Sequence, residues 1–166
     1  MSGTPTDATV HTARANAPVE LGFDSADFER ASRGLVAQHA TGQMGSAWDI
    51  NRYDFIEQGA PNPDTLNPSL WRQALLNNVH GLFEVAPKVW QARGYDISNI
   101  TFIEGDTGWV VIDPLTVQET AAACLELANS RLGERPVTGV IYTHSHTDHF
   151  GGVLGVTTPE DVTAGR

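Results

Sequence analysis

A loop rich in metal-binding side chains follows the most strand-like segment of this chain, and it constrains what the chain can fold into. Residues 137–142 are an apolar run typical of a buried strand, and residues 143–152 then read Thr-His-Ser-His-Thr-Asp-His-Phe-Gly-Gly. Imidazole and carboxylate groups are ligands that a borderline cation such as Zn²⁺ accepts. Such a cluster at the end of a buried strand is costly to desolvate unless something binds it. The segment therefore favours a metal site over a solvated polar loop.

The spacing of the four candidate ligands predicts two metal ions. His144 and His146 are two positions apart, so on extended backbone their side chains leave on the same side and can hold one ion. Asp148 and His149 follow one turn later and can face a second ion. Two ions about 3.5–4 Å apart lower the pKa of a shared water towards ~7. The Gly151-Gly152 pair then lets the backbone turn sharply close to the site.

The composition is that of an ordinary folded domain and argues against a nucleic-acid partner and a membrane span. The 166 residues are 40% hydrophobic, and 20 acidic against 10 basic residues give a formal net charge of -10. A surface this acidic repels phosphate backbones. No run approaches the roughly 20 apolar residues of a membrane span, and the first twenty residues do not resemble a signal peptide. We therefore expect no nucleic-acid partner, no membrane span and a cytoplasmic location.

The first half of the chain has the composition of a tail followed by a helical arm. Residues 1–20 are rich in Thr, Ala and small polar residues and predict a disordered tail. Residues 25–39 have a helical apolar pattern, and Asn67-Pro68 is typical of the start of a second helix that ends at His80-Gly81. Residues 21–80 are therefore expected to form a helical N-terminal arm.

The three histidines of this first half are not assigned to the metal site. His11 lies in the predicted tail and receives no role. His39 and His80 fall at the ends of predicted helices, where a positive charge is favoured by the helix dipole. Both are interpreted as structural residues.

Two β-hairpins are predicted next, each with a turn whose residues suit a tight reversal of the chain. The strand-like residues of the first are 82–86 and 89–93, around Pro87-Lys88, and those of the second are 97–104 and 109–112, around residues 105–108.

A helix then leads into the strand before the metal loop. Residues 116–131 have a helical apolar face, and Thr116 with Glu119 three positions later is typical of a capping box. The strand-helix-strand order predicts a right-handed crossover and parallel pairing of the two strands. The single cysteine, Cys124, lies on the apolar face of this helix, so we predict a core residue and not a nucleophile.

Asp113 has two interpretations that the sequence leaves open. Asp113-Pro114 ends the strand-like segment 109–112, so the side chain can serve the turn alone. It can equally accept a hydrogen bond from a histidine of the metal site, because imidazoles that bind a metal usually donate their other N–H to an acceptor.

Four segments besides the metal loop carry a resemblance to a known family. They are Asn67-Pro68-Ser69-Leu70-Trp71-Arg72-Gln73, Gly81-Leu82-Phe83-Glu84-Val85, Ile103-Glu104-Gly105-Asp106-Thr107-Gly108-Trp109 and Ile112-Asp113-Pro114-Leu115. Together with the loop they resemble the metal-dependent alkyl sulfatases, a branch of the metallo-β-lactamase superfamily that hydrolyses dodecyl sulfate. The loop is shared across the superfamily and specifies only the metals. The likeness extends over about residues 22–156.

The resemblance implies a fold, a cofactor and a reaction. The family has an αββα sandwich with two zinc ions, and by resemblance His144 and His146 would bind one zinc while Asp148 and His149 bind the other. Asp148 would also be a catalytic residue. The implied function is hydrolysis of alkyl sulfate esters to alcohol and sulfate, as in detergent degradation. A homodimer is implied too, through a region that follows the catalytic domain in the family.

The sequence departs from the family at Arg166, where it stops before the further carboxylates and histidine that complete both zinc sites. We therefore expect an α/β (α+β) chain in which residues 81–166 are the truncated first half of the sandwich, preceded by the helical arm. This 166-residue fragment is expected to be inactive alone. Two alternatives stay open: a hydrolase of the same fold that acts on another ester, a thioester, a lactam or a phosphodiester, and an inactive remnant that binds metal weakly.

Overall fold

The computed structural model describes residues 6–16, 22 and 24–165, which form two compact units. The first unit draws on the described residues of Met1–Ser32 and Tyr53–Val79, and the second on those of Arg33–Arg52 and His80–Arg166. The short 3₁₀ helix η1 (Ile50–Tyr53) spans the boundary between them in the sequence. Within the described part of the chain, no helix is both long and apolar enough to cross a membrane.

The first unit contains the helices α1 (Asp7–Asn16), α2 (Ala26–Ser32) and α3 (Pro68–Asn77). Helix α3 begins as predicted, because the Asn67 side chain accepts a hydrogen bond from the Ser69 N–H at 3.0 Å and Pro68 occupies the first turn. An ion pair of 2.7 Å between Arg72 and Asp27 joins α3 to α2.

Residues 7–16 form helix α1, although the sequence predicted a disordered tail over residues 1–20. The Thr6 hydroxyl caps the helix by accepting from the Thr9 N–H at 3.3 Å. Asp7 in the first turn and Arg14 in the last turn both complement the helix dipole. The other residues of the predicted tail, 1–5 and 17–20, lie outside the described residues.

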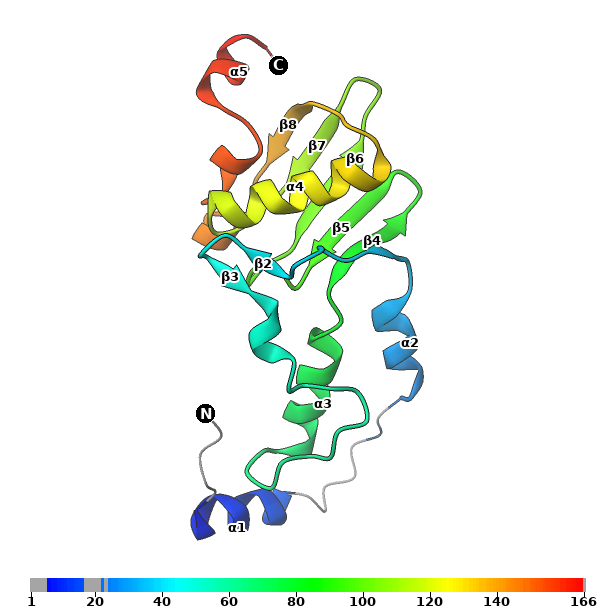
Figure 1. The fold of residues 1–166 in the computed structure, drawn as a ribbon, viewed down its shortest axis with the longest axis vertical. Helices are drawn as coiled ribbons and strands as arrows, with labels where there is room; N and C mark the ends of the chain where they lie inside the picture. Colours follow the sequence, from blue (N-terminus) through cyan, green and yellow to red (C-terminus); the bar gives the residue numbers. More distant parts are fainter. Residues whose placement is uncertain (1–5, 17–21, 23, 166) are drawn as a thin grey trace. The chain divides into compact units, whose positions relative to one another are not determined.

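The second unit is built on a six-stranded sheet with the strand order β1-β4-β5-β6-β7-β8 (Figure 1). Neighbouring strands pair antiparallel, except for β7 and β8, which pair parallel. The strands are β1 (Leu35–Ala37), β4 (Gly81–Ala86), β5 (Val89–Arg93), β6 (Ile100–Glu104), β7 (Trp109–Ile112) and β8 (Val137–Ile141). Both predicted hairpins and the predicted parallel crossover are confirmed.

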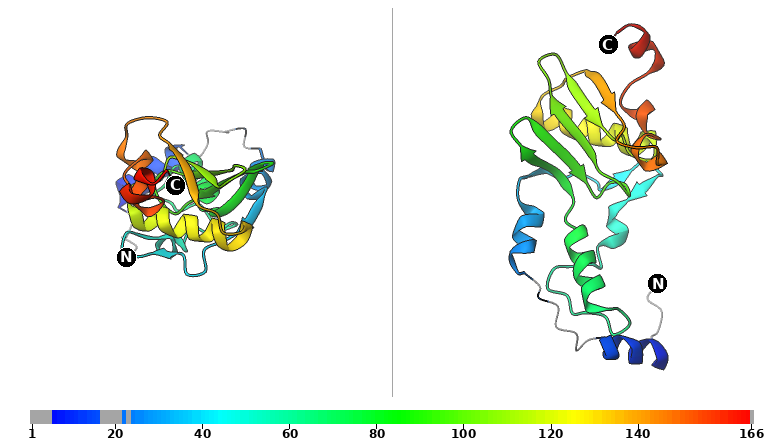
Figure 2. Two further views of the ribbon diagram at one scale, coloured as in Figure 1. Left: turned by 90° about the horizontal axis from the view of Figure 1, so that it is seen from above. Right: turned by 180° about the vertical axis from the view of Figure 1, so that it is seen from behind.

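Helix α4 (Gln118–Leu132) makes the crossover from β7 to β8 and lies across one face of the sheet (Figures 1 and 2). The smaller elements of this unit are a two-stranded hairpin of β2 (Gln43–Met44) and β3 (Trp48–Asp49), the 3₁₀ helices η2 (Thr147–His149) and η3 (Val153–Gly155), and helix α5 (Pro159–Thr163). Apolar side chains of the sheet and of α4 make the core, among them Leu82, Ile100, Phe102, Trp109, Val111, Ala121 and Ala128.

The helix predicted over residues 25–39 is wrong beyond Ser32, because residues 35–37 form strand β1. Gly34 explains the break: its φ of 81° is left-handed, and its carbonyl accepts from the Glu84 N–H at 2.8 Å. A Cβ at this position would lie 2.2 Å from the Glu84 carbonyl oxygen. Pairing with β4 therefore overrides the local helical pattern, and these residues join the sheet instead of the arm.

The predicted capping box at Thr116 is also wrong. Helix α4 begins at Gln118 with Val117 as its N-cap, and no side chain caps it. The Thr116 hydroxyl donates instead to the buried carboxylate of Asp96 at 2.6 Å. Hydrogen bonds to an ionised acceptor are stronger than neutral ones, so this long-range partner prevails over the local cap.

Cys124 lies on the buried face of α4 and is part of the core, as predicted. Burial raises the pKa of its thiol far above the ordinary value, and the negative charge of Asp96 adds to the shift. A buried thiol that stays protonated is not a nucleophile.

Candidate metal centre

The loop that follows β8 lies tightly against the segment that precedes α4. The Gly152 N–H donates to the Leu115 carbonyl at 2.9 Å. A Cβ at Gly152 would lie 2.2 Å from the Pro114 carbonyl oxygen, and one at Gly151 would lie 2.2 Å from that of Thr116. The glycine pair is therefore needed for close approach of two backbones.

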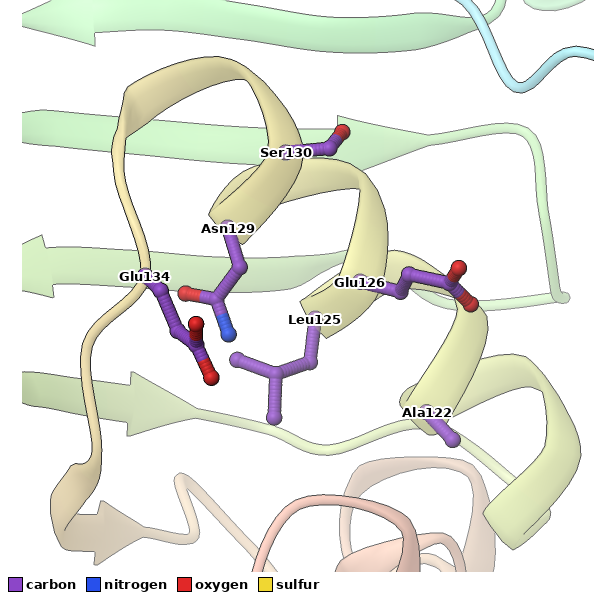
Figure 3. Close-up of a pocket in the computed structure, with 6 residues that line it drawn as sticks. All are labelled: Ala122, Leu125, Glu126, Asn129, Ser130 and Glu134. Carbon is purple, nitrogen blue, oxygen red and sulfur yellow. The ribbon is translucent and has the colours of Figure 1, made fainter.

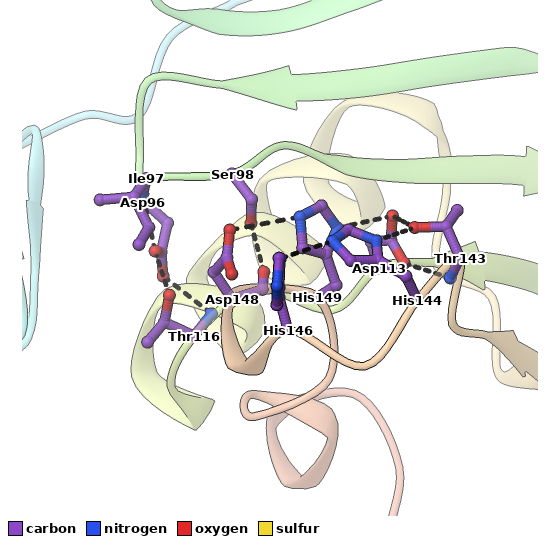
Figure 4. Close-up of polar contacts among 10 residues, drawn as sticks. All are labelled: Asp96, Ile97, Ser98, Asp113, Thr116, Thr143, His144, His146, Asp148 and His149. Carbon is purple, nitrogen blue, oxygen red and sulfur yellow. Dashed lines mark hydrogen bonds and ion pairs between the residues drawn. The ribbon is translucent and has the colours of Figure 1, made fainter.

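Three imidazoles gather on this loop (Figure 4). The ring centroids of His144 and His146 are 4.7 Å apart, and those of His144 and His149 are 4.0 Å apart. The facing nitrogens His144 Nε2 and His146 Nδ1 are separated by 3.1 Å. Two nitrogen ligands of one tetrahedral zinc ion, each ~2.0–2.1 Å from the metal, lie about 3.3 Å apart. The first histidine pair is thus spaced as two ligands of one ion would be.

Asp148 and His149 form the second pair of the loop. They lie in the single turn of η2, and Asp148 Oδ2 is 3.2 Å from His149 Nε2. Both side chains are partly exposed.

Asp113 joins the end of β7 to the loop. Its carboxylate accepts from the Thr143 N–H at 2.8 Å and from the Thr143 hydroxyl at 2.7 Å, and its Oδ2 lies 2.8 Å from His149 Nδ1. Burial tends to raise the pKa of Asp113, but the hydrogen bonds from Thr143 and His149 hold it below its ordinary value. Its φ of 55° is left-handed, so Asp113 is a turn residue and a partner of His149 at once.

The donor chemistry of the loop suits zinc, but the side chains do not enclose an ion as they stand. Among residues 6–16, 22 and 24–165, no three His, Cys, Asp or Glu side chains converge on one metal position. The donors instead contact one another and Asp113 (Figure 4). Structural zinc sites use four protein ligands and catalytic ones usually three. The loop can therefore supply part of a metal coordination sphere.

Contacts to this loop also come from residues that the sequence analysis did not identify. The Ser98 hydroxyl donates to the Asp148 carbonyl (Figure 4). Thr143, which opens the loop, holds Asp113 through both its N–H and its hydroxyl. No spacing in the sequence marks Ser98, because its partner lies 50 positions away.

The histidines that were interpreted as structural do not join the loop. His39 and His80 both contact the ring of Tyr95, with centroids 6.2 and 5.6 Å away. His11 is an exposed residue of α1. A shallow pocket on α4 is lined by none of the candidate ligands; it is formed by Ala122, Leu125, Glu126, Asn129, Ser130 and Glu134 (Figure 3).

Comparison with known proteins shows what this chain is similar to. Residues 93–166 match the Metallo-beta-lactamase superfamily. A linear primary-alkylsulfatase of Pseudomonas sp. is 48% identical over 153 residues, which are 89% of this chain and 23% of the relative. An (R)-specific secondary-alkylsulfatase of Pseudomonas sp. is 48% identical over 168 residues, which are 96% of this chain and 25% of the relative.

A solved structure confirms the predicted fold class. The stereoselective inverting sec-alkylsulfatase Pisa1 from Pseudomonas sp. superposes with a TM-score of 0.89 at 44% identity, over 99% of this chain and 26% of that chain. An alkyl/aryl-sulfatase of Saccharomyces cerevisiae is 46% identical over 93% of this chain and 25% of the relative. The chain thus spans about a quarter of the length of the curated relatives that it matches.

Proposed function

Because this chain is related to the alkylsulfatases of the metallo-β-lactamase superfamily, we propose that the protein hydrolyses alkyl sulfate esters, such as dodecyl sulfate, to alcohol and sulfate, with zinc as cofactor. The observation that carries the proposal is the grouping of three imidazoles and a carboxylate on one loop, in a chain that is 48% identical to two alkylsulfatases. The net charge of -10 does not attract a sulfate ester, so binding of the head group relies on local positive charge.

The contacts within the loop support a separate role for each pair of its residues. His144 and His146 would hold one zinc ion, and Asp148 and His149 the other, with Asp148 also acting in catalysis. When bound, two zinc ions supply a water of lowered pKa and neutralise charge on the departing oxygen. Asp113 keeps a proton on His149 Nδ1, because an ionised carboxylate only accepts hydrogen bonds. His149 Nε2 then keeps its lone pair for a metal.

The test of this proposal is release of sulfate from dodecyl sulfate. Two forms should be assayed: residues 1–166, and the longest product of the reading frame that contains them. Four protein ligands cannot close two zinc sites, so we expect turnover from the longer form and none from the 166-residue form. Turnover should stop with a chelator and return with Zn²⁺. If neither form releases sulfate in a chelator-sensitive manner, while a thioester or lactam is cleaved, the alkylsulfatase activity is contradicted.

Asp113→Asn is predicted to weaken zinc binding with little change in the melting temperature. Asparagine tolerates the left-handed φ of this position, so the turn is retained. Its amide N–H₂ would face His149 Nδ1 and favour the tautomer with the proton on Nε2, which cannot bind a metal. Loss of such a supporting acceptor typically lowers metal affinity about 10–100-fold.

Competition between the protein and a chromophoric chelator measures this change. Asp106→Asn is the matched control, since Asp106 is an exposed residue of the turn between β6 and β7. Equal zinc affinity in Asp113→Asn and wild type would contradict a supporting role for Asp113 in metal binding. Asp113 would then serve only the turn.

A further inference from the structure

The turn between β5 and β6 contacts the metal loop and the start of α4 at the same time (Figure 4). The Ser98 hydroxyl donates to the carbonyl of Asp148. This bond acts on the main chain of a candidate ligand, and it links positions 50 residues apart. Ser98 is therefore placed to restrain the main chain from which the Asp148 side chain extends.

Asp96, two positions earlier, is a buried carboxylate that is 9% exposed. Its two oxygens accept from the Ile97 N–H at 2.7 Å, the Thr116 hydroxyl at 2.6 Å, the Thr120 hydroxyl at 2.6 Å and the Thr116 N–H at 3.2 Å. The charge is thus satisfied by N–H and O–H donors alone. Removing such an acceptor would leave several buried donors without a partner. Because this is costly, the intact network is rigid and specific.

The partners of Asp96 are the segment on which the metal loop packs. The Thr116 carbonyl oxygen lies so close to Gly151 that a Cβ there would be 2.2 Å away. The adjacent Leu115 carbonyl accepts from the Gly152 N–H. Asp96 thus fixes one surface that supports the loop, and Ser98 holds the loop directly.

We propose that Asp96 and Ser98 are positioning residues of the metal centre, which hold the main chain of the Asp148–His149 turn in the place where these side chains bind a metal. Asp113 orients His149 from one side, and the 96–98 turn holds Asp148 from another. The inference rests on the proposed function for the identity of the ligands, but the positioning itself is a property of the metal-free chain.

Ser98→Ala tests the proposal first without metal, by amide hydrogen exchange of the 166-residue chain. The amides to follow are those of His149, which donates to the His146 carbonyl, and of Phe150 and Gly151, which donate to the Thr147 carbonyl. Loss of one hydrogen bond that restrains this turn should speed their exchange up to about tenfold. Amides of β5 and β6 should exchange as in wild type.

Two matched variants separate positioning from general stability. Ser98→Thr keeps the hydroxyl and should restore slow exchange. Ser130→Ala removes a hydroxyl that likewise donates to a backbone carbonyl, that of Leu127 at 2.9 Å, but on α4, and it should leave the 149–151 amides unchanged. Unchanged exchange in Ser98→Ala, or equal acceleration across the whole sheet, would overturn the positioning role.

Zinc affinity is the second measurement. We expect Ser98→Ala and Asp96→Asn to weaken zinc binding about 10–100-fold relative to wild type, and Ser98→Thr to bind as wild type does. If the longer form with the wild-type sequence binds no zinc while the exchange result holds, the proposed zinc function fails and the positioning of the turn stands. If zinc binds equally well to all variants, the positioning proposal fails and the zinc function stands.

Discussion

The double variant His144→Ala/His146→Ala is expected to lose about one zinc ion per chain and all chelator-sensitive sulfate release from the longer form of the protein. The two imidazoles face each other with their nearest nitrogens 3.1 Å apart, so the double variant removes two ligands of the same proposed ion. Asp148 and His149 would remain as ligands of the other ion. An open metal site depends on enclosing the cation in a fixed geometry, so loss of two ligands should leave no measurable binding there.

Elemental analysis of protein loaded with zinc and then desalted measures the metal content, and sulfate release measures the activity. Ser145→Ala is the matched control, because it changes the residue between the two histidines and leaves both imidazoles in place. Unchanged zinc content in the double variant would exclude His144 and His146 as ligands. Loss of both ions at once would instead contradict the division of the loop into two pairs.

The elements around the loop were predictable because their signals are local. The hairpin turn at Lys88, the strand-like segments around it and the apolar run before Thr143 each specify structure within a few residues. The Asn67-Pro68 start of α3 is of the same kind, and the structure confirms it. The glycine pair was predicted to let the backbone turn sharply near the site, and the structure shows in addition that it permits close approach to the Pro114 and Thr116 carbonyls.

The elements that were missed depend on partners far away in the sequence. Residues 35–37 were expected to continue a helix, and they form β1 because β4 offers an edge about 45 positions later. Thr116 was expected to cap α4, and its hydroxyl instead donates to Asp96, 20 positions earlier. Single-sequence patterns report local preference, so such long-range choices are not visible in them.

The residues of the candidate site also differ in whether their sequence signal is local or depends on a distant partner. The candidate ligands share one short motif, and the sequence alone could name them. Asp113 could be named as one of two alternatives, because its place at a strand end is local and its contact with His149 is not. Ser98 and Asp96 carry no such signal in the sequence. Ser98 was placed in the strand-like segment 97–104, whereas β6 begins only at Ile100, and an aspartate is typical of any turn.

Trp109→Ala is expected to have the largest effect on the stability of the second unit. Trp109 is fully buried in β7, and its indole N–H donates to Asn129 Oδ1 of α4 at 2.8 Å. Its ring makes edge contacts with Trp90 and Phe102, at centroid distances of 5.6 and 6.0 Å. Truncation of a buried tryptophan to alanine typically costs about 3–5 kcal/mol, a large part of the roughly 5–15 kcal/mol that stabilises a domain.

The melting temperature of this unit should therefore fall by at least about 10 °C in Trp109→Ala, or the cooperative transition should be lost. Trp109→Phe keeps most of the buried ring and should cost less, and Asn129→Ala removes only the partner of the indole N–H. Because β7 pairs with β8, which leads directly into the loop, zinc binding should be lost in parallel with folding. A Trp109→Ala protein that melts at the wild-type temperature would show that this ring does not stabilise the core between the sheet and α4.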